Sequence, residues 1–179
     1  MTDPGLVLEL TTPRLRLLAL TGWHLSLLLD EPEELERLLG LVEGHARLPA
    51  ELRQPVQEML NRTLADPANT VWTTNWQIVA GSPPRIVGGF CFKGAPDNGG
   101  EVEIGYGLNP GSQGQGFMTE ALSVAVPWAL EQPGVQAVIA ETERDNLPSQ
   151  AVLRRTGFVR YRETATALWW RRQRRADTP

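Results

Sequence analysis

The sequence predicts a single-domain α/β protein whose sheet is mixed and mostly antiparallel, with helices flanking it. Stretches in which apolar and polar residues alternate lie in the middle and near the end of the chain, and this period of two predicts strands. Strands and helices alternate in the second half only, which is typical of a mixed sheet. With 179 residues, of which 41% are hydrophobic, the chain can bury one substantial core. No repeat or linker divides residues 1–179.

The first third of the chain is expected to form two short strands and then three helices. Thr21 and Asp30 are candidate N-caps for the first two helices, and Gly40 would end the second. The third helix carries apolar residues at three- and four-residue steps, which gives it one apolar face. The expected ranges are 6–10 and 14–20 for the strands and 22–29, 32–39 and 50–64 for the helices.

The middle of the chain predicts a three-stranded antiparallel meander. From residue 71 the period changes to two, and Trp72, Thr74, Trp76 and Ile78 would share one face. The two tryptophans could therefore pack in the core or line a binding pocket. A Gly-Ser-Pro-Pro turn at 81–84 ends the first strand. The second and third strands are expected at 86–93 and 101–108.

The last third of the chain predicts a helix, a strand, a second helix and a closing hairpin. Pro127 is a misfit in the first helix, because proline removes a backbone hydrogen bond and usually causes a kink. Asp145 or Asn146 would cap the second helix. The arginine-rich end, about 171–179, is expected to be a short, solvated basic tail. The expected ranges are 115–130 and 147–155 for the helices and 135–142, 158–163 and 167–172 for the strands.

Composition and charge exclude several classes of partner. The net charge of −4 gives no overall attraction for nucleic acid or for an anionic membrane. No stretch is apolar enough to span a bilayer, and the first residues lack the basic start of a signal peptide. Cys91 is the single cysteine, so no intrachain disulfide can form, and we expect a cytoplasmic protein.

The cysteine and the histidines predict neither a nucleophile nor a metal site. Cys91 lies in an expected central strand with no histidine near it in the sequence, so we interpret it as a core residue. His24 and His45 are the only histidines, and neither has a cysteine or carboxylate at ligand spacing. We therefore expect no metal.

The most informative stretch is 101–130, EVEIGYGLNPGSQGQGFMTEALSVAVPWAL, which predicts a strand, a tight loop and a helix. Gly111, Gly114 and Gly116 allow sharp backbone turns and bring N–H groups close to a ligand. The first turn of the helix adds unpaired N–H groups and the positive end of the helix dipole. Together these features predict an anion cradle, with phosphate as the expected ligand.

Two common phosphate-binding motifs do not fit this loop. A P-loop ends with Lys-Ser or Lys-Thr after its glycines, and neither pair occurs here. A dinucleotide-binding motif needs Gly-x-Gly-x-x-Gly, but Gly114 and Gly116 are followed by Thr119 in the third glycine position. The loop is therefore expected to bind a phosphate ligand of another kind.

Four strings together resemble the GNAT N-acetyltransferases, particularly the branch that includes the ribosomal-protein N-terminal acetyltransferases. They are TTPRLRLLAL, EIGYGL, NPGSQGQGFMTEAL and DNLPSQAVLRRTGF, in the order and spacing of that family. The resemblance implies a GNAT fold in which strands 101–108 and 135–142 splay apart and acetyl-CoA binds between them. The loop departs from the family at Gly111, where Gln or Arg is usual.

The resemblance also implies which residues contact acetyl-CoA. Backbone N–H groups of the loop and the first helical turn would bind the pyrophosphate. Asn146 would bind the pantetheine or order a water, and it could also simply cap a helix, since the two roles are compatible. The expected cofactor-binding residues are Gly107, Leu108, Gln113, Gly114, Gln115, Gly116, Phe117, Met118, Thr119, Asn146 and Ser149.

Attack of an amine on a thioester requires a group that accepts the amine proton. Glu101 and Glu103 lie two apart in the expected strand and face the same way, opposite to Val102 and Ile104. Glu103 stands where the resembling branch has its proposed base, so we favour it as the catalytic base. The alternative is that both glutamates are solvated residues on an exposed face of the sheet.

The thioester carbonyl and the leaving thiolate each need a further group. The resemblance implies a backbone N–H near Gly107 or Leu108 as the donor to the carbonyl oxygen. Many GNAT enzymes protonate the thiolate with a tyrosine, but that position holds Leu153 here. Ser149 stands where the ribosomal branch has a serine, and we expect it to orient or hydrogen-bond the thiol sulfur.

The favoured hypothesis is an enzyme that transfers an acetyl group from acetyl-CoA to a primary amine. The rival is a non-catalytic acyl-CoA-binding sensor or scaffold, which Gly111 and Leu153 favour. A nucleic-acid binder that uses the arginine tail conflicts with the acidic remainder of the chain.

The sequence leaves the acceptor amine and the partners open. A protein N-terminus, a lysine, a polyamine, an aminoglycoside or another small amine would each fit as acceptor. Trp169 and Trp170 are a candidate homodimer contact.

Overall fold

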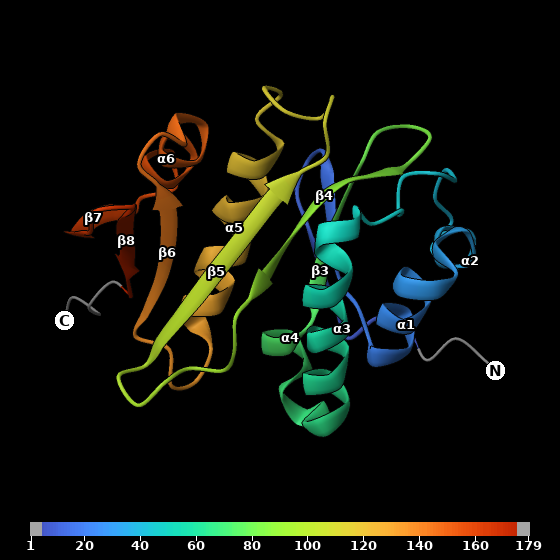
Figure 1. Cartoon of the computed structure of the whole chain (residues 1–179), viewed down its shortest axis with the longest axis horizontal. Helices are drawn as coiled ribbons and strands as arrows, with labels where there is room; N and C mark the ends of the chain where they lie inside the picture. The colour runs from blue at the N-terminus through green and yellow to red at the C-terminus, as the bar shows by residue number, and fades with distance from the viewer. Residues whose placement is uncertain (1–4, 175–179) are drawn as a thin grey trace.

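The computed structural model describes residues 5–174, which form one eight-stranded sheet with helices on both faces (Figure 1). The strands are β1 (Leu8–Thr11), β2 (Leu15–Ala19), β3 (Asn75–Ala80), β4 (Arg85–Phe92), β5 (Glu101–Leu108), β6 (Ala137–Glu143), β7 (Val159–Glu163) and β8 (Ala167–Gln173). The helices are α1 (Gly22–Asp30), α2 (Pro32–Leu38), α3 (Ala50–Ala65), α4 (Thr70–Thr73), α5 (Phe117–Glu131) and α6 (Leu147–Arg155). No helix within residues 5–174 is long and apolar enough to cross a membrane.

The sheet is mixed, as predicted, and it opens at its centre. Its order is β1-β2-β3-β4-β5-β6-β8-β7, and β5 with β6 is the parallel pair. That pair joins only Glu101, Val102 and Glu103 to the start of β6, whereas the ladder between β4 and β5 continues to Leu108. The two central strands therefore diverge after Glu103, which confirms the predicted splay (Figure 1).

The core occupies both faces of the sheet. On one face lies α5, whose predicted inner residues are all buried: Met118, Ala121, Leu122, Ala125 and Ala129. Three of these five are alanines, whose small side chains let the helix lie close to the strands. On the other face, leucines of α1, α2 and α3 pack against β2, β3 and β4. The sheet thus lies between two layers of helices.

The tryptophans of the middle region are core residues rather than pocket residues. Trp76 is fully buried, and its ring lies 5.2 to 6.5 Å from those of Phe90, Phe92 and Trp128. Trp72 joins the same cluster, with its ring 5.5 Å from that of Trp128. This aromatic cluster ties the hairpin of β3 and β4 to α5.

One predicted strand begins too early. The segment from 71 to 73 belongs to the short helix α4, and β3 starts only at Asn75. A 3₁₀ turn at Pro67–Asn69 leads into this helix, and the Thr70 hydroxyl donates to the Pro67 carbonyl at 2.7 Å. Packing of Trp72 into the aromatic cluster therefore outweighs the strand preference of Val71 and Trp72.

The helix caps agree with the sequence at one position and differ at another. Thr21 caps α1 by accepting from the His24 N–H at 3.2 Å, as predicted. Asp30, however, is the last residue of α1, and Glu31 precedes α2 without a side-chain cap. Pro32 opens α2, and proline at a first helical position has no N–H that needs a partner.

The arginines near the C-terminus are held to the fold. Arg171 and Arg172 lie within β8, and Arg171 pairs with Glu101 at 3.0 Å. Arg172 and Arg174 donate to backbone carbonyls at 2.6 to 2.8 Å. The prediction of a solvated tail is therefore wrong for Arg171 and Arg172, which are half-buried in a strand, whereas Arg174 is exposed as predicted. Arg175 lies outside the described residues.

Candidate active site

The loop between β5 and α5 has the backbone that its glycine pattern predicts. Gly111, Gly114 and Gly116 have φ of +81°, +73° and +80°, in the left-handed region that other residues seldom adopt. Residues 113–116 are exposed, and Gly116 directly precedes α5 as an N-cap that has no side chain. The loop therefore presents its backbone to solvent at the start of the helix.

The first turn of α5 offers N–H groups to an anion. The Glu120 N–H donates to the Gly116 carbonyl at 3.0 Å, which begins the helical hydrogen bonding. The N–H groups of Phe117, Met118 and Thr119 precede it and have no helical acceptor. Since the side chains of Phe117 and Met118 are buried, these two residues can meet a ligand only through their backbone. Together with the positive end of the helix dipole, these groups form an anion site.

The start of the loop is tied to β4. The Asn109 N–H donates to the Val87 carbonyl at 2.9 Å, and the Asn109 side-chain amide lies 3.3 Å from the Ile86 carbonyl. The Ser112 N–H then donates to the Asn109 carbonyl at 3.0 Å. These bonds fix the path of the chain before a ligand arrives, and such preorganisation lowers the cost of binding.

The backbone of β5 beyond Glu103 bonds to β4 on one side and faces the gap to β6 on the other. In an antiparallel ladder, residues that bond to the neighbouring strand alternate with residues whose N–H and C=O point away from it. The Glu103 carbonyl accepts from Lys93 at 2.8 Å, and Asn109 donates to β4, so the odd-numbered residues bond to β4. By this alternation, the N–H of Gly107 faces β4, whereas the N–H of Leu108 faces the gap.

Two predicted residues on α6 lie together beside this gap. Asn146 caps α6, because its side-chain oxygen accepts from the Ser149 N–H at 3.1 Å, as predicted. The Ser149 Oγ lies 2.7 Å from the Tyr106 Oη, and the tyrosine hydroxyl is also 3.2 Å from the Ser149 carbonyl oxygen. A pair of hydroxyls thus joins β5 to α6 across the opening of the sheet.

Tyr106 is a candidate site residue that the sequence did not predict. Its alternation with Val102 and Ile104 assigns it to the core face of β5, and its partner Ser149 is 43 residues away in the sequence. Only the divergence of β5 and β6 brings the two hydroxyls together. The one available signal is a tyrosine at the end of a strand whose other inward residues are aliphatic.

Burial raises the pKa of Tyr106 to about 12, although the hydrogen bond to Ser149 opposes this shift. Because the pKa is raised in the folded state, the protonated hydroxyl of Tyr106 contributes its full stabilisation at any pH below the ordinary tyrosine pKa of about 10. This contribution is lost as the pH rises toward 12. The chain has two tyrosines, so in Tyr161→Phe the tyrosinate absorbance reports Tyr106 alone. We expect a midpoint near 12. A midpoint near the ordinary value would contradict the buried hydroxyl pair.

The two glutamates of β5 lie on the face opposite to α5, and each forms an ion pair. The Lys93 ammonium pairs with Glu103, and the Arg171 guanidinium pairs with Glu101 at 3.0 Å. Their side chains are 22% and 25% exposed, so neither is a freely solvated surface residue. Glu103 is opposite Ile139 in the last pair of the ladder between β5 and β6, which puts it at the point of divergence.

Cys91 and Leu153 have structural positions. Burial raises the pKa of the Cys91 thiol, although the positive charge of Lys93 opposes the shift, so a protonated thiol is expected at neutral pH. Leu153 is fully buried in the core. Within residues 5–174, no three His, Cys, Asp or Glu side chains gather as they would around a metal ion.

A cavity of about 1080 Å³ lies away from the glycine loop, between α5, the end of α6, β7 and β8. It contains none of the predicted site residues, and four arginines line it: Arg155, Arg171, Arg172 and Arg174. Arg174 donates to the Leu130 carbonyl at 2.6 Å, in the last turn of α5, where the helix dipole favours a cation. Arg172 likewise donates to the Thr156 carbonyl just after α6, so these two arginines bond to the ends of helices.

The glycine loop at the start of α5, beside two diverging strands, is the arrangement expected of an acetyl-CoA-binding α/β domain. Residues 14–159 match the acetyltransferase (GNAT) domain, and this match covers most of the chain. The chain therefore belongs to the GNAT acetyltransferase family.

Similar proteins agree with this assignment. The chain is 36% identical over 96 residues to an uncharacterized N-acetyltransferase, YjdG, of Bacillus subtilis strain 168, a match that covers 54% of this chain and 57% of that protein. It thus spans a little over half the length of this relative.

Two solved structures share the fold. The ribosomal-protein-S5-alanine acetyltransferase of Vibrio fischeri has a TM-score of 0.68 at 15% identity, over 96% of this chain and 100% of that one. RimL, a ribosomal L7/L12 α-N-protein acetyltransferase in complex with coenzyme A, has a TM-score of 0.65 at 18% identity, over 93% and 98%. At these identities the likeness concerns the fold alone.

Proposed function

We propose that this protein transfers an acetyl group from acetyl-CoA to a primary amine, by direct attack within a ternary complex. The observation that carries the proposal is the left-handed glycine loop at the start of α5, which opens onto the gap between β5 and β6. Family membership and the coenzyme A bound by RimL support the same cosubstrate.

In this proposal the loop and α5 bind the phosphates of acetyl-CoA. Backbone N–H groups from Gln113 to Thr119 would donate to the pyrophosphate, with the helix dipole favouring its negative charge. The pantetheine would then enter the gap beside Asn146 and Ser149. Alternation along β5 favours Leu108 over Gly107 as the donor to the thioester oxygen, because the N–H of Leu108 faces the gap.

Glu103 is the proposed proton acceptor, directly or through a water. It lies at the divergence of β5 and β6, on the face opposite to α5, whereas Glu101 lies two residues earlier, inside the paired part of the strands. An amine that attacks from this face would meet the thioester in the gap and lose its proton toward the carboxylate. The mechanism as proposed uses no metal ion.

Ser149 is proposed to hydrogen-bond the thiol sulfur of the leaving group. Its N–H bonds to Asn146 and its hydroxyl lies beside Tyr106, so its position is fixed from two sides. Leu153, by contrast, is buried and has no acidic proton to give to the leaving thiolate. This feature favours a second candidate function, an acyl-CoA-binding sensor or scaffold that turns over slowly or not at all.

The acceptor class is proposed to be a protein N-terminus or a small-molecule amine. The names of the two structural neighbours concern ribosomal proteins. An N-terminal amine, with a pKa of about 8, also loses its proton more readily than a lysine at about 10.4.

A panel of amines tests the proposed function. Thiol release from acetyl-CoA would be followed with N-terminal peptides, lysine peptides, polyamines and aminoglycosides, and each product would be identified by mass. The proposal expects release that depends on one amine class and matches its acetylation one to one. Tight acetyl-CoA binding without amine-dependent release would favour the sensor instead.

A further inference from the structure

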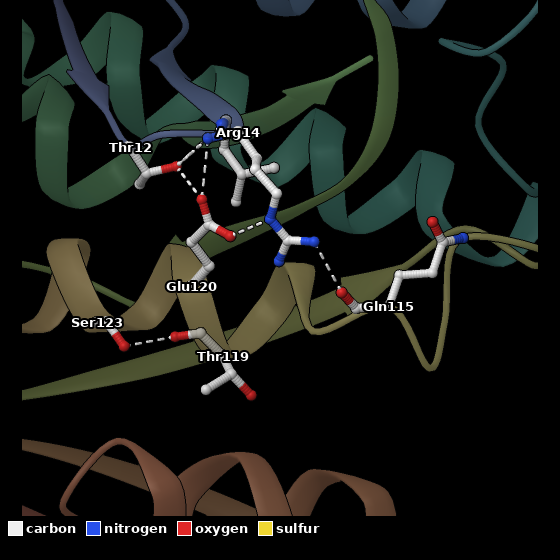
Figure 2. A network of polar contacts seen from close by, with 7 residues as sticks. Thr12, Arg14, Gln115, Thr119, Glu120 and Ser123 are labelled. Carbon is white, nitrogen blue, oxygen red and sulfur yellow. Dashed lines mark hydrogen bonds and ion pairs between the residues drawn. The ribbon is translucent and has the colours of Figure 1, made fainter.

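The turn between β1 and β2 contacts the start of α5, more than 100 residues later in the chain (Figure 2). The Arg14 Nε donates to one carboxylate oxygen of Glu120 at 2.6 Å. The other oxygen accepts from the Thr12 hydroxyl at 2.5 Å and from the Arg14 N–H at 3.1 Å. We call Thr12, Arg14 and Glu120 the clamp, since they join the first hairpin to the helix.

Glu120 is held as a carboxylate in this clamp. Burial opposes its ionisation, but the hydrogen bonds from Thr12 and Arg14 outweigh burial and lower its pKa. Its place in the first turn of α5 adds a favourable interaction with the helix dipole. The clamp is therefore fully charged at neutral pH, and it weakens only as the pH falls below the ordinary glutamate range.

The Arg14 guanidinium reaches past Glu120 to the glycine loop itself. Its Nη1 donates to the Gln115 carbonyl at 3.1 Å (Figure 2). The guanidinium carbon lies 5.0 Å from the centre of the Phe117 ring, within the range of a cation–π contact. Between these two residues is Gly116, where an added Cβ would lie 3.5 Å from the Arg14 Nη2. One side chain thus contacts Gln115 and Phe117, on either side of Gly116, where the loop becomes a helix.

This contact matters because the other side-chain bond of the loop's second half, from the Gln115 amide to the Gly111 carbonyl at 3.0 Å, lies within the loop and does not tie it to the rest of the fold. Its first half is bonded to β4 through Asn109, but residues 113–116 are exposed, and both Gly114 and Gly116 are conformationally permissive. Flexible glycines lose much conformational freedom when they bind a ligand, unless another group has already ordered them. No lysine or arginine occurs between residues 109 and 120, so the nearby cation comes from the first hairpin.

We propose that Arg14 is a positioning residue for acetyl-CoA, which orders the second half of the glycine loop from outside. The inference rests on the proposed function for the identity of the ligand. Arg14 does so by holding the Gln115 carbonyl and Glu120 at once, which turns the N–H groups of 115–119 toward the phosphate site. A planar guanidinium suits this task, because it bonds two acceptors in a fixed geometry.

Arg14→Gln and Arg16→Gln form a matched pair for the test. Arg16 lies two residues further along, and its Nε pairs with Glu9 at 2.7 Å in an ion pair of similar exposure, away from the loop. We expect Arg14→Gln to raise the Kd and the KM for acetyl-CoA about tenfold, with kcat and the acceptor KM unchanged. Arg16→Gln should leave all four unchanged. The Kd and KM of Arg14→Lys for acetyl-CoA should lie between those of wild type and Arg14→Gln. An ammonium group keeps the positive charge but cannot bond two acceptors in the planar geometry of a guanidinium.

Hydrogen exchange in the ligand-free protein separates this inference from the proposed function. Amides of 120–122, whose hydrogen bonds begin α5 with that from Glu120 to the Gly116 carbonyl, should exchange about tenfold faster in Arg14→Gln than in wild type, while those of β2 and β3 stay unchanged. Unaltered exchange at 120–122, or equal acetyl-CoA affinity in Arg14→Gln and Arg16→Gln, would overturn the positioning role. Failure of wild type to bind acetyl-CoA would instead count against the proposed function, whatever the exchange shows.

Discussion

Gly114→Leu should weaken acetyl-CoA binding by about 100-fold, which corresponds to the loss of roughly two charge-assisted hydrogen bonds to phosphate. Gly114 has a φ of +73°, and leucine in this left-handed region strains the backbone. Relief of this strain would displace the backbone N–H groups that the loop is proposed to offer to the phosphates. Calorimetric titration of acetyl-CoA and of free CoA measures the effect, and both ligands should lose affinity equally because they share the pyrophosphate.

Gly134→Leu is the control for this prediction. Gly134 has a φ of +82°, and no atom lies within 4 Å of its added Cβ, as is also true of Gly114. It lies in the turn between α5 and β6, away from the loop. The two variants should therefore lose similar stability, while only Gly114→Leu loses affinity. Equal affinity in both would show that acetyl-CoA does not use this loop.

Glu103→Gln should lower kcat by roughly 100-fold to 10,000-fold, the range for loss of a general base. The amide keeps the shape of the carboxylate but cannot take the amine proton. Acetyl-CoA affinity should stay within about twofold of wild type, because the proposed phosphate contacts are elsewhere. Without the base, the rate should climb with pH until the free amine forms, near pH 8 for an N-terminus.

Glu101→Gln is the matched control, since Glu101 lies on the same face, is similarly exposed and also pairs with a cation. It removes an ion pair of the same kind from the paired part of the strands. We expect kcat within about threefold of wild type, because Glu101 lies where β5 and β6 are still paired, before the proposed reaction site. A loss in Glu101→Gln as large as that in Glu103→Gln would point to the sheet's surface charge rather than to one base.

The stretch from β5 to α5 was predictable because its signals are local. A period of two, a glycine cluster and a run of helix formers each act over a few residues, and the observed boundaries of α5 differ from the predicted ones by two residues or fewer. The backbone of the loop follows from Gly111, Gly114 and Gly116, since only glycine adopts such φ values easily.

The contacts that complete the site were not predictable from the sequence, because each joins distant segments. Tyr106 meets Ser149 only because β5 and β6 diverge, and Arg14 meets Glu120 only because the first hairpin packs beside α5. Lys93, directly after β4, faces Glu103 of β5, and this pairing depends on strand register. The strand predicted over Trp72 failed for a similar reason, since tertiary packing outweighed its local preference.

Amide-resolved NMR titration of acetyl-CoA into the wild-type protein is the most direct test of the central claim. It shows whether acetyl-CoA occupies the glycine loop and the gap between β5 and β6. The largest shift changes should occur at the amides of 113–119 and of Leu108, with smaller ones at Asn146 and Ser149. Changes confined to the arginine-lined cavity between α5 and β8, or no saturable change at all, would contradict the account.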